Sequence, residues 1–349
     1  MKVSIILSLF LCVFSLTTIG SDFDKATEKR MKESATQFFL NHDLIELTVR
    51  ADFSALRSDR DRTNHDYHSA NLEWNDAGES IKIPFKLKTR GNFRLKCENC
   101  DFPPLRFKFK TKNTVNTIFE GQKKLKLVTH CRDTSEVMQQ AMLREYLVYK
   151  LYNTISDYSL RVRLVKVKYV DVITGDELDR YAFFIESKSQ MAARLGVEEI
   201  QMANLTQKEL VQNNTVQLAL FNYMIGNTDW SIPKLHNVTL LRNERHAPPI
   251  AVPYDFDMSE FVNASYMNKY MGRELLENRY KGVKVSMDAL EISLDHYQSR
   301  KVQLTDTILD FDYIDVEGKQ QCLQLINSFY KLVENKAAAR KAFITEASK

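Results

Sequence analysis

The chain has 349 residues, of which 44% are hydrophobic and 11% aromatic, and its formal net charge is +4. This composition is typical of a well-packed globular protein and excludes an intrinsically disordered chain. The small positive charge gives no reason to expect a nucleic-acid partner. A chain of this length suffices for one two-lobed domain or two small ones.

Residues 1–20 have the pattern of a secretory signal peptide. Lys2 is followed by an apolar run over 3–16 and then by small and polar residues before Ser21. The run is shorter than the roughly 20 residues that span a bilayer, although an uncleaved anchor stays open as an alternative. We therefore expect an exported protein (periplasmic, extracellular or at the cell surface) without an integral membrane segment after cleavage. A polar lead-in segment follows over 21–43.

Four cysteines lie outside the predicted signal segment, namely Cys97, Cys100, Cys131 and Cys322. Export affects how they are interpreted. In an oxidising compartment, disulfide bonds are the first expectation. A zinc site built from all four is the second, and a redox-active C-x-x-C at Cys97 and Cys100 is the third. Free thiols are the remaining alternative, and the pairing is not determined by the sequence.

Residues 44–187 are rich in predicted strands. Apolar alternation and turn signals predict strands over 44–51, 71–74, 81–87, 105–109, 123–129, 160–172 and 178–185. Between them, an amphipathic helix is predicted over 135–153, with Ser135 as its N-cap and Val137, Tyr146 and Tyr149 on its packing side. This helix also carries Glu145.

The strand over 105–109 has a wholly basic face. Arg106, Lys108 and Lys110 alternate with apolar residues, and the strand follows a basic turn that contains Arg90. Such a surface could hold phosphate groups. A solvent-facing antiparallel strand is the ordinary alternative.

Two acidic blocks stand out in the predominantly helical segment 188–349. A helix predicted over 206–225 ends at Gly226 and leads to Asp229 and Asn237, and a short strand pair then delivers Asp255 and Asp257. Carboxylate and amide oxygens in this pattern suit a Mg²⁺ ion that holds a polyphosphate. Each of these residues, taken singly, is also an ordinary turn former.

The blocks G-N-T-D-W-(x)6-H-N and V-P-Y-D-F-D resemble the catalytic region of the CotH family, atypical kinases related to spore-coat protein H. The resemblance covers about residues 86–261. It implies an α+β, two-lobed protein-kinase-like fold, with a strand-rich lobe over 44–187 and a mostly helical lobe over 188–349. It also implies Mg²⁺- or Mn²⁺-dependent transfer of the γ-phosphoryl group of ATP to a hydroxyl of a secreted or surface protein.

The resemblance also implies roles for individual residues. Asp229 would act as the base, Asn237 would bind a metal beside it, Asp255 would be the main metal ligand and Asp257 a second one. On the nucleotide side, a cation of the R-G-N turn or the basic strand would hold the phosphates. Lys108 is the first choice, before Arg106 and Arg90. Glu145 would pair with that lysine, and the backbone near Glu186 would meet the adenine edge.

Some features differ from the pattern of kinases. Asn237 follows Asp229 by eight residues, a longer spacing than in conventional kinases, and a G-x-G-x-x-G loop is absent. These differences favour an alternative function, a secreted kinase-like binding or scaffold module without transfer. A metal-dependent hydrolase that uses Asp229, Asp255, Asp257 and His236 is a third possibility. The acceptor and the oligomeric state stay open.

Overall fold

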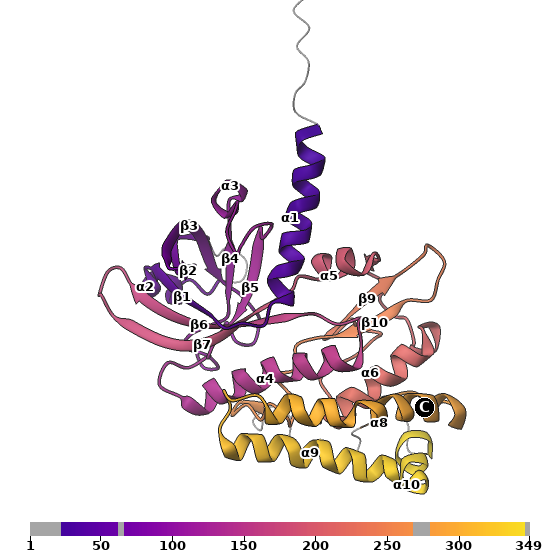
Figure 1. Cartoon of the computed structure of the whole chain (residues 1–349). Helices are drawn as coiled ribbons and strands as arrows, with labels where there is room; N and C mark the ends of the chain where they lie inside the picture. Colours follow the sequence, from indigo (N-terminus) through magenta and orange to yellow (C-terminus); the bar gives the residue numbers. More distant parts are fainter. Residues whose placement is uncertain (1–21, 62–65, 268–279, 346–349) are drawn as a thin grey trace, which may run out of the picture.

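A computed structural model describes residues 22–61, 66–267 and 280–345, so the predicted signal segment at 1–20 lies outside the described residues. Seven strands form a closed barrel in the order β1-β2-β3-β4-β5-β7-β6 (Figure 1). They are β1 (Ile45–Ala51), β2 (His68–Asp76), β3 (Glu79–Thr89), β4 (Leu105–Lys108), β5 (Lys124–Val128), β6 (Val162–Asp171) and β7 (Glu177–Ile185).

One parallel pairing closes the barrel. β1 runs parallel to β6, from Ile45 opposite Val165 to Ala51 opposite Asp171, whereas the other neighbouring strands are antiparallel. Aromatic side chains fill the interior. Phe119 is fully buried there and packs against Trp74 and Phe109 with ring centroids 5.2 and 5.4 Å apart.

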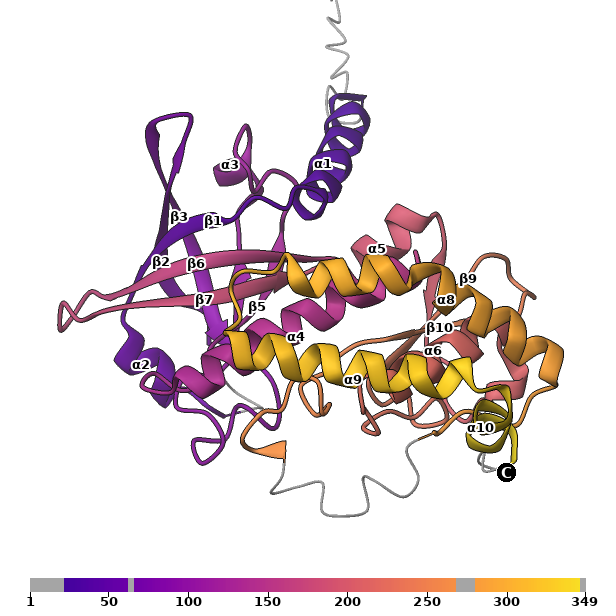
Figure 2. The ribbon, with the colours of Figure 1, turned by 60° about the horizontal axis from the view of Figure 1, so that its bottom comes forward.

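The helices that precede β6 are α1 (Asp22–Leu40), α2 (Phe53–Ser58), α3 (Thr111–Thr114) and α4 (Glu136–Ile155). α4 lies between strands β6 and β7 on one side and α8 on the other (Figures 1 and 2). Its N-cap is Ser135, whose hydroxyl accepts the N–H of Met138. No helix in the described ranges is long and apolar enough to cross a membrane.

Beyond β7, helices surround a second sheet of three antiparallel strands in the order β10-β9-β8. The elements are α5 (Lys188–Leu195), β8 (Glu198–Ile200), the 3₁₀ turn η1 (Gln207–Glu209), α6 (Gln212–Met224), β9 (Val238–Arg242), β10 (Ile250–Pro253), α8 (Met287–Leu309), α9 (Val316–Glu334), α10 (Lys336–Arg340) and a π-helical turn η3 (Lys341–Thr345).

The expected two-lobed kinase-like fold with a mostly helical second lobe is wrong. The first seven strands close into a barrel, and the segment after residue 188 contains its own sheet. Alternation along a strand predicts which side chains face inward, but it does not tell which distant strand is the partner. The parallel pairing of β1 with β6, which closes the barrel, is therefore not visible in the sequence pattern.

Candidate functional site

The first acidic block follows the end of α6. Gly226 adopts a left-handed conformation (φ 64°) that ends the helix. Two buried amides then fix the loop, because Asn227 Nδ2 donates to Asn222 Oδ1 (2.8 Å) and the backbone N–H of Asp229 donates to Asn227 Oδ1 (3.0 Å). The position of Asp229 is thus set by the core of the protein.

Asp229 and Asn237 contact each other directly. Asn237 Nδ2 donates to the backbone oxygen of Asp229 (2.8 Å) and to its Oδ2 (2.9 Å). Both amide hydrogens are therefore used, and Asn237 Oδ1 is left as the acceptor that a metal ion could meet. The φ of Asn237 is 52°, a left-handed conformation that asparagine tolerates better than most residues. His236 Nε2 lies 2.8 Å from the second oxygen of Asp229, Oδ1.

Lys281 supports the same loop from the far side. Its Nζ donates to the carbonyl oxygens of Thr228 and Trp230, each at 2.8 Å, and these residues flank Asp229. Burial lowers the pKa of Lys281, whereas the charge of Asp229 raises it. This lysine was not singled out from the sequence because it lies far along the chain from the acidic blocks.

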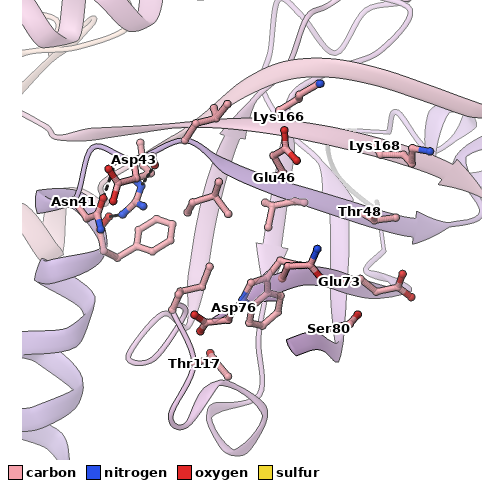
Figure 3. A pocket seen from close by; sticks show the side chains of 18 of the residues that line it. Asn41, Asp43, Glu46, Thr48, Glu73, Asp76, Ser80, Thr117, Lys166 and Lys168 are labelled. Atoms are coloured by element: carbon pink, nitrogen blue, oxygen red, sulfur yellow. Dashed lines mark hydrogen bonds between the residues drawn. The ribbon is translucent and has the colours of Figure 1, made fainter. Parts of the chain in front are cut away.

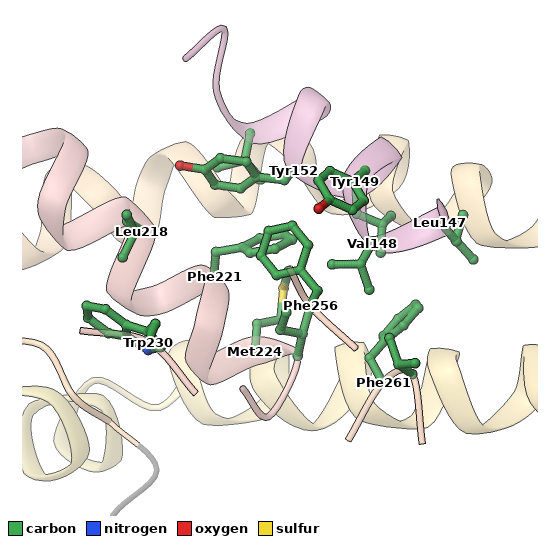
Figure 4. Packing of buried hydrophobic residues seen from close by; sticks show 14 of the residues in the cluster. Leu147, Val148, Tyr149, Tyr152, Leu218, Phe221, Met224, Trp230, Phe256 and Phe261 are labelled. Carbon is green, nitrogen blue, oxygen red and sulfur yellow. The ribbon is translucent and has the colours of Figure 1, made fainter. Parts of the chain in front are cut away.

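The second acidic block is anchored by Phe256. Its side chain is fully buried, with ring centroids 4.9 Å from Tyr149 of α4 and 5.8 Å from Phe221 of α6 (Figure 4). The aromatic cluster therefore fixes the backbone between Asp255 and Asp257. These two carboxylates nevertheless have different surroundings.

Asp255 is exposed to solvent, yet its pKa is raised, first by the protein atoms that surround it and then by the charge of Asp257. Its backbone is left-handed (φ 63°), which is strained for a residue other than glycine and is frequent at functional sites. The charge of Asp229 also raises the pKa of Asp255, so the structure brings these two predicted residues together.

Asp257 is committed to neighbouring side chains. Its Oδ2 lies 2.8 Å from Arg94 Nη2 and accepts the hydroxyl of Tyr266 at 2.7 Å. The same guanidinium lies 2.6 Å from Glu145 Oε2. Burial raises the pKa of Glu145 to about 7, and Arg94 opposes this shift while Asp257 and Asp255 add to it. Glu145 therefore pairs with Arg94 and not, as expected, with Lys108.

A cluster of cations faces Asp255. Burial lowers the pKa of the Lys126 amine to about 8, and the neighbouring positive charges that lower it further belong to Arg90, Lys188 and Arg106. Burial lowers the pKa of Arg90 as well, whereas Asp255 raises it. Within the described ranges, none of these four side chains has a carboxylate within hydrogen-bond or ion-pair distance. We call these four residues the cation cluster.

The residues predicted to hold the phosphates of a nucleotide do not all lie near Asp255. Arg90 and Arg106 belong to the cation cluster, but Lys108 is exposed and its Nζ lies 5.0 Å from the ring of Tyr67. Lys126, opposite Arg106 on β5, takes the place next to the acids. The alternation of K-L-K-L-V indicates that Lys126 faces outward, but its neighbours become clear only once β5 is paired with β4.

Glu186 is buried and paired with Arg194, whose Nη2 lies 2.9 Å from Glu186 Oε2. Its backbone N–H donates to the carbonyl oxygen of Arg161 at 2.9 Å. That N–H is therefore not available to a nucleotide base. Contact between the adenine edge and the backbone near Glu186 stays a prediction. It would have to use backbone groups other than the N–H of Glu186.

The donor set around Asp255 fits a metal–polyphosphate complex in part. The described residues contain no group of three or more His, Cys, Asp or Glu side chains arranged to hold a metal ion. Mg²⁺ is commonly bound by one or two protein oxygens and completes its coordination with phosphate and water. Asp255 and Asn237 Oδ1 could provide such oxygens, and the unpaired cation cluster could receive the phosphates.

A groove of about 960 Å³ lies elsewhere, on the outside of the barrel beside α1 (Figure 3). Opposite charges alternate along it, as Glu46 and Lys166 do on the neighbouring strands β1 and β6. Lys168 is already paired with Glu177 at 2.8 Å. Because the charges compensate one another, this groove has no strong preference for an anion or a cation.

A disulfide joins Cys100 and Cys131, which confirms the first expectation for the cysteines and is compatible with export. It rules out a zinc site formed by all four thiolates. Cys97 is free and exposed, and Cys322 is free and buried. The disulfide fastens the loop that carries Arg90 and Arg94 to the segment that leads into α4.

Fold and site together define a β-barrel protein in which the acidic residues after α6 and β10 lie near a cluster of cations. No protein-family model matches the chain, and no curated protein matches it.

Proposed function

We propose that the two acidic blocks and the cation cluster together bind a nucleoside triphosphate with a divalent metal ion and transfer a phosphoryl group to a hydroxyl of a polypeptide. The observation that carries this proposal is the cation cluster. Arg90, Arg106, Lys126 and Lys188 lie together without carboxylate partners in the described residues. Like charges in partly buried surroundings repel one another, and a polyphosphate provides the negative charges that relieve this repulsion.

The two acidic blocks suit the binding of the metal ion and the orientation of the acceptor hydroxyl. Asp255 and Asn237 Oδ1 would hold Mg²⁺ or Mn²⁺, which would neutralise charge that develops on the phosphates. Asp229 would orient the acceptor hydroxyl and accept its proton, and Asn237 and Lys281 hold Asp229 in place. Arg94 neutralises Asp257 and Glu145 and so connects α4 to the second acidic block. Because function depends on the site, this proposal does not need a kinase-like fold.

One observation favours a second candidate function, hydrolysis of a phosphoester. His236 Nε2 lies 2.8 Å from Asp229 Oδ1, and such a pair could activate a water molecule in place of a substrate hydroxyl. Transfer is the better-supported function because the cation cluster is larger than a single phosphoester needs.

The test is incubation of the exported protein with γ-labelled ATP, Mg²⁺ or Mn²⁺ and a mixture of secreted polypeptides. Label on a polypeptide should fall by at least about 100-fold in Asp229→Asn and Asp255→Asn, and it should be unchanged in the control Asp179→Asn, an exposed acid on β7. Release of free phosphate without labelled polypeptide would support hydrolysis. Nucleotide binding without either product would indicate a binding module, and absence of binding would refute the proposal.

A further inference from the structure

The cation cluster is one edge of a larger basic surface on the outside of the barrel. β3, β4 and β5 are adjacent strands (Figure 1), and their registers place cations opposite one another in two rows. The inner row consists of Lys88, Arg106 and Lys126, of which Arg106 and Lys126 belong to the cation cluster. The outer row, two residues farther along each strand, consists of Lys86, Lys108 and Lys124.

This surface follows from the alternation of the three strands. The residues between the cations point into the barrel, where Leu87, Phe107 and Leu125 belong to its hydrophobic core. Neighbouring strands lie about 4.8 Å apart, and alternate residues about 6.6 Å apart. The six cations therefore form a lattice of about 10 Å by 7 Å. A nucleotide bound by the cation cluster would use the inner row and leave the outer row free.

The outer row lacks compensating acids. In the described part of the chain, no carboxylate lies within hydrogen-bond or ion-pair distance of Lys86, Lys108 or Lys124. The closest recorded contact is aromatic, since the ring of Tyr67 lies 5.0 Å from Lys108 Nζ and 4.9 Å from Lys88 Nζ. Tyr67 thus lies near cations of both rows.

A pocket adjoins the outer row. Its volume is about 520 Å³, and its lining includes Lys86, Lys108 and Lys110 together with the apolar residues Ala70, Phe85 and Phe109. Inorganic polyphosphate and the backbone of a nucleic acid have no apolar group for such a lining. A polypeptide with acidic residues and one apolar side chain fits both the row and the pocket.

We infer that the outer row and this pocket bind an acidic segment of the polypeptide that accepts the phosphoryl group. Recognition of an acidic polypeptide depends only on the basic surface. The role of that polypeptide as phosphoryl acceptor rests on the proposed function. The small net charge of +4 and the acids elsewhere on the barrel, such as Glu46 and Glu73, make an extended nucleic-acid footprint the poorer match.

The experiment measures binding of a fluorescein-labelled random copolymer of glutamate and tyrosine to the full exported protein by fluorescence anisotropy. The variant Lys86→Gln/Lys124→Gln should bind about tenfold more weakly, as expected for the loss of two surface charge contacts. The matched control Lys166→Gln/Lys168→Gln removes two lysines from β6, away from the lattice, and should bind like the wild type. Both variants should keep the affinity for ATP, measured separately.

The outcomes separate the two proposals. If copolymer binding depends on the outer row but ATP does not bind, the basic docking surface is supported and the proposed nucleotide binding is refuted. ATP binding with copolymer affinity equal in wild type and outer-row variant would refute the docking surface alone. Tighter, outer-row-dependent binding of oligothymidylate or inorganic polyphosphate than of the copolymer would also overturn the choice of an acidic polypeptide.

Discussion

The backbone N–H of Asp255 donates a hydrogen bond to the hydroxyl of Tyr149 at 2.9 Å. This contact joins α4 to the loop after β10, and it holds Asp255 in its left-handed conformation. Glu145 lies one helical turn before Tyr149 on α4, so one face of this helix reaches both acidic residues of the second block. The geometry around Asp255 therefore depends on the docking of α4.

The variant Tyr149→Phe should weaken this connection. Without the hydroxyl, the N–H of Asp255 loses its acceptor, and we expect the free energy of unfolding to fall by about 1–3 kcal/mol, together with a loss of metal-dependent nucleotide affinity. Tyr146→Phe on the same helix is the control, because the Tyr146 hydroxyl has no recorded hydrogen bond in the described residues. Chemical denaturation measures both variants, and equal stability of Tyr149→Phe and wild type would contradict the assigned role.

Nucleotide binding should depend on pH through Lys126. The pKa of Lys126 is about 8 in the free protein, and a bound polyphosphate would raise it because it favours the charged amine. Above pH 8, binding must therefore take up a proton, and affinity should fall as the pH rises. Calorimetry at pH 8.5 in buffers of different ionisation enthalpy detects this uptake. Lys126→Arg, which stays charged, should show neither proton uptake nor the fall in affinity. Identical pH profiles of affinity for the wild type and Lys126→Arg would contradict the prediction.

Arg94 should be essential for stability as well as for the site. Arg94→Gln leaves the carboxylates of Glu145 and Asp257 buried without their cation, and we expect a loss of about 3–5 kcal/mol in the free energy of unfolding. Adding Glu145→Gln removes one of the uncompensated charges, so the double variant should recover part of this loss. A double variant that is less stable than Arg94→Gln would show that the ion pair is not the source of the effect.

The disulfide should stabilise the loop that carries Arg90 and Arg94. Cys100 and Cys131 are 31 residues apart, and the replacement of both by serine should lower the free energy of unfolding by about 2–4 kcal/mol. Cys97→Ser is the control, since Cys97 is free and exposed. Thermal unfolding under non-reducing conditions measures the difference. Equal melting temperatures for Cys100→Ser/Cys131→Ser and wild type would refute this contribution.

Local structure was largely predictable from the sequence. Strands β1 to β7 occur where alternation and turn signals place them, and α4 begins after the predicted cap Ser135. Val137, expected on the packing side of α4, is 63% exposed, whereas Met138 and Gln139 of the same turn are buried and face the core instead. The helix expected over 206–225 begins only at Gln212, after the separate turn η1.

The parts of the site that depend on long-range contacts were not predictable. Closure of the barrel requires the pairing of β1 with β6, and the neighbours of Lys126 follow from the pairing of β5 with β4. The partner of Glu145 is an arginine in a loop 51 residues earlier in the chain, which no local spacing indicates. By contrast, Asp229, Asn237 and Asp255 stand in recognisable blocks, and the structure brings Asn237 and Asp255 to the same side as Asp229.

The most direct measurement is calorimetric titration of ATP into the protein with and without Mg²⁺, for wild type and Asp255→Asn. If the cation cluster holds the phosphates and Asp255 holds the metal, wild type binds ATP more tightly with Mg²⁺, and Asp255→Asn loses at least about tenfold of the affinity for the complex. The variant should still bind ATP alone, because the cation cluster is intact. Absence of ATP binding to the wild type, or an equal effect of Mg²⁺ in both proteins, would contradict the account.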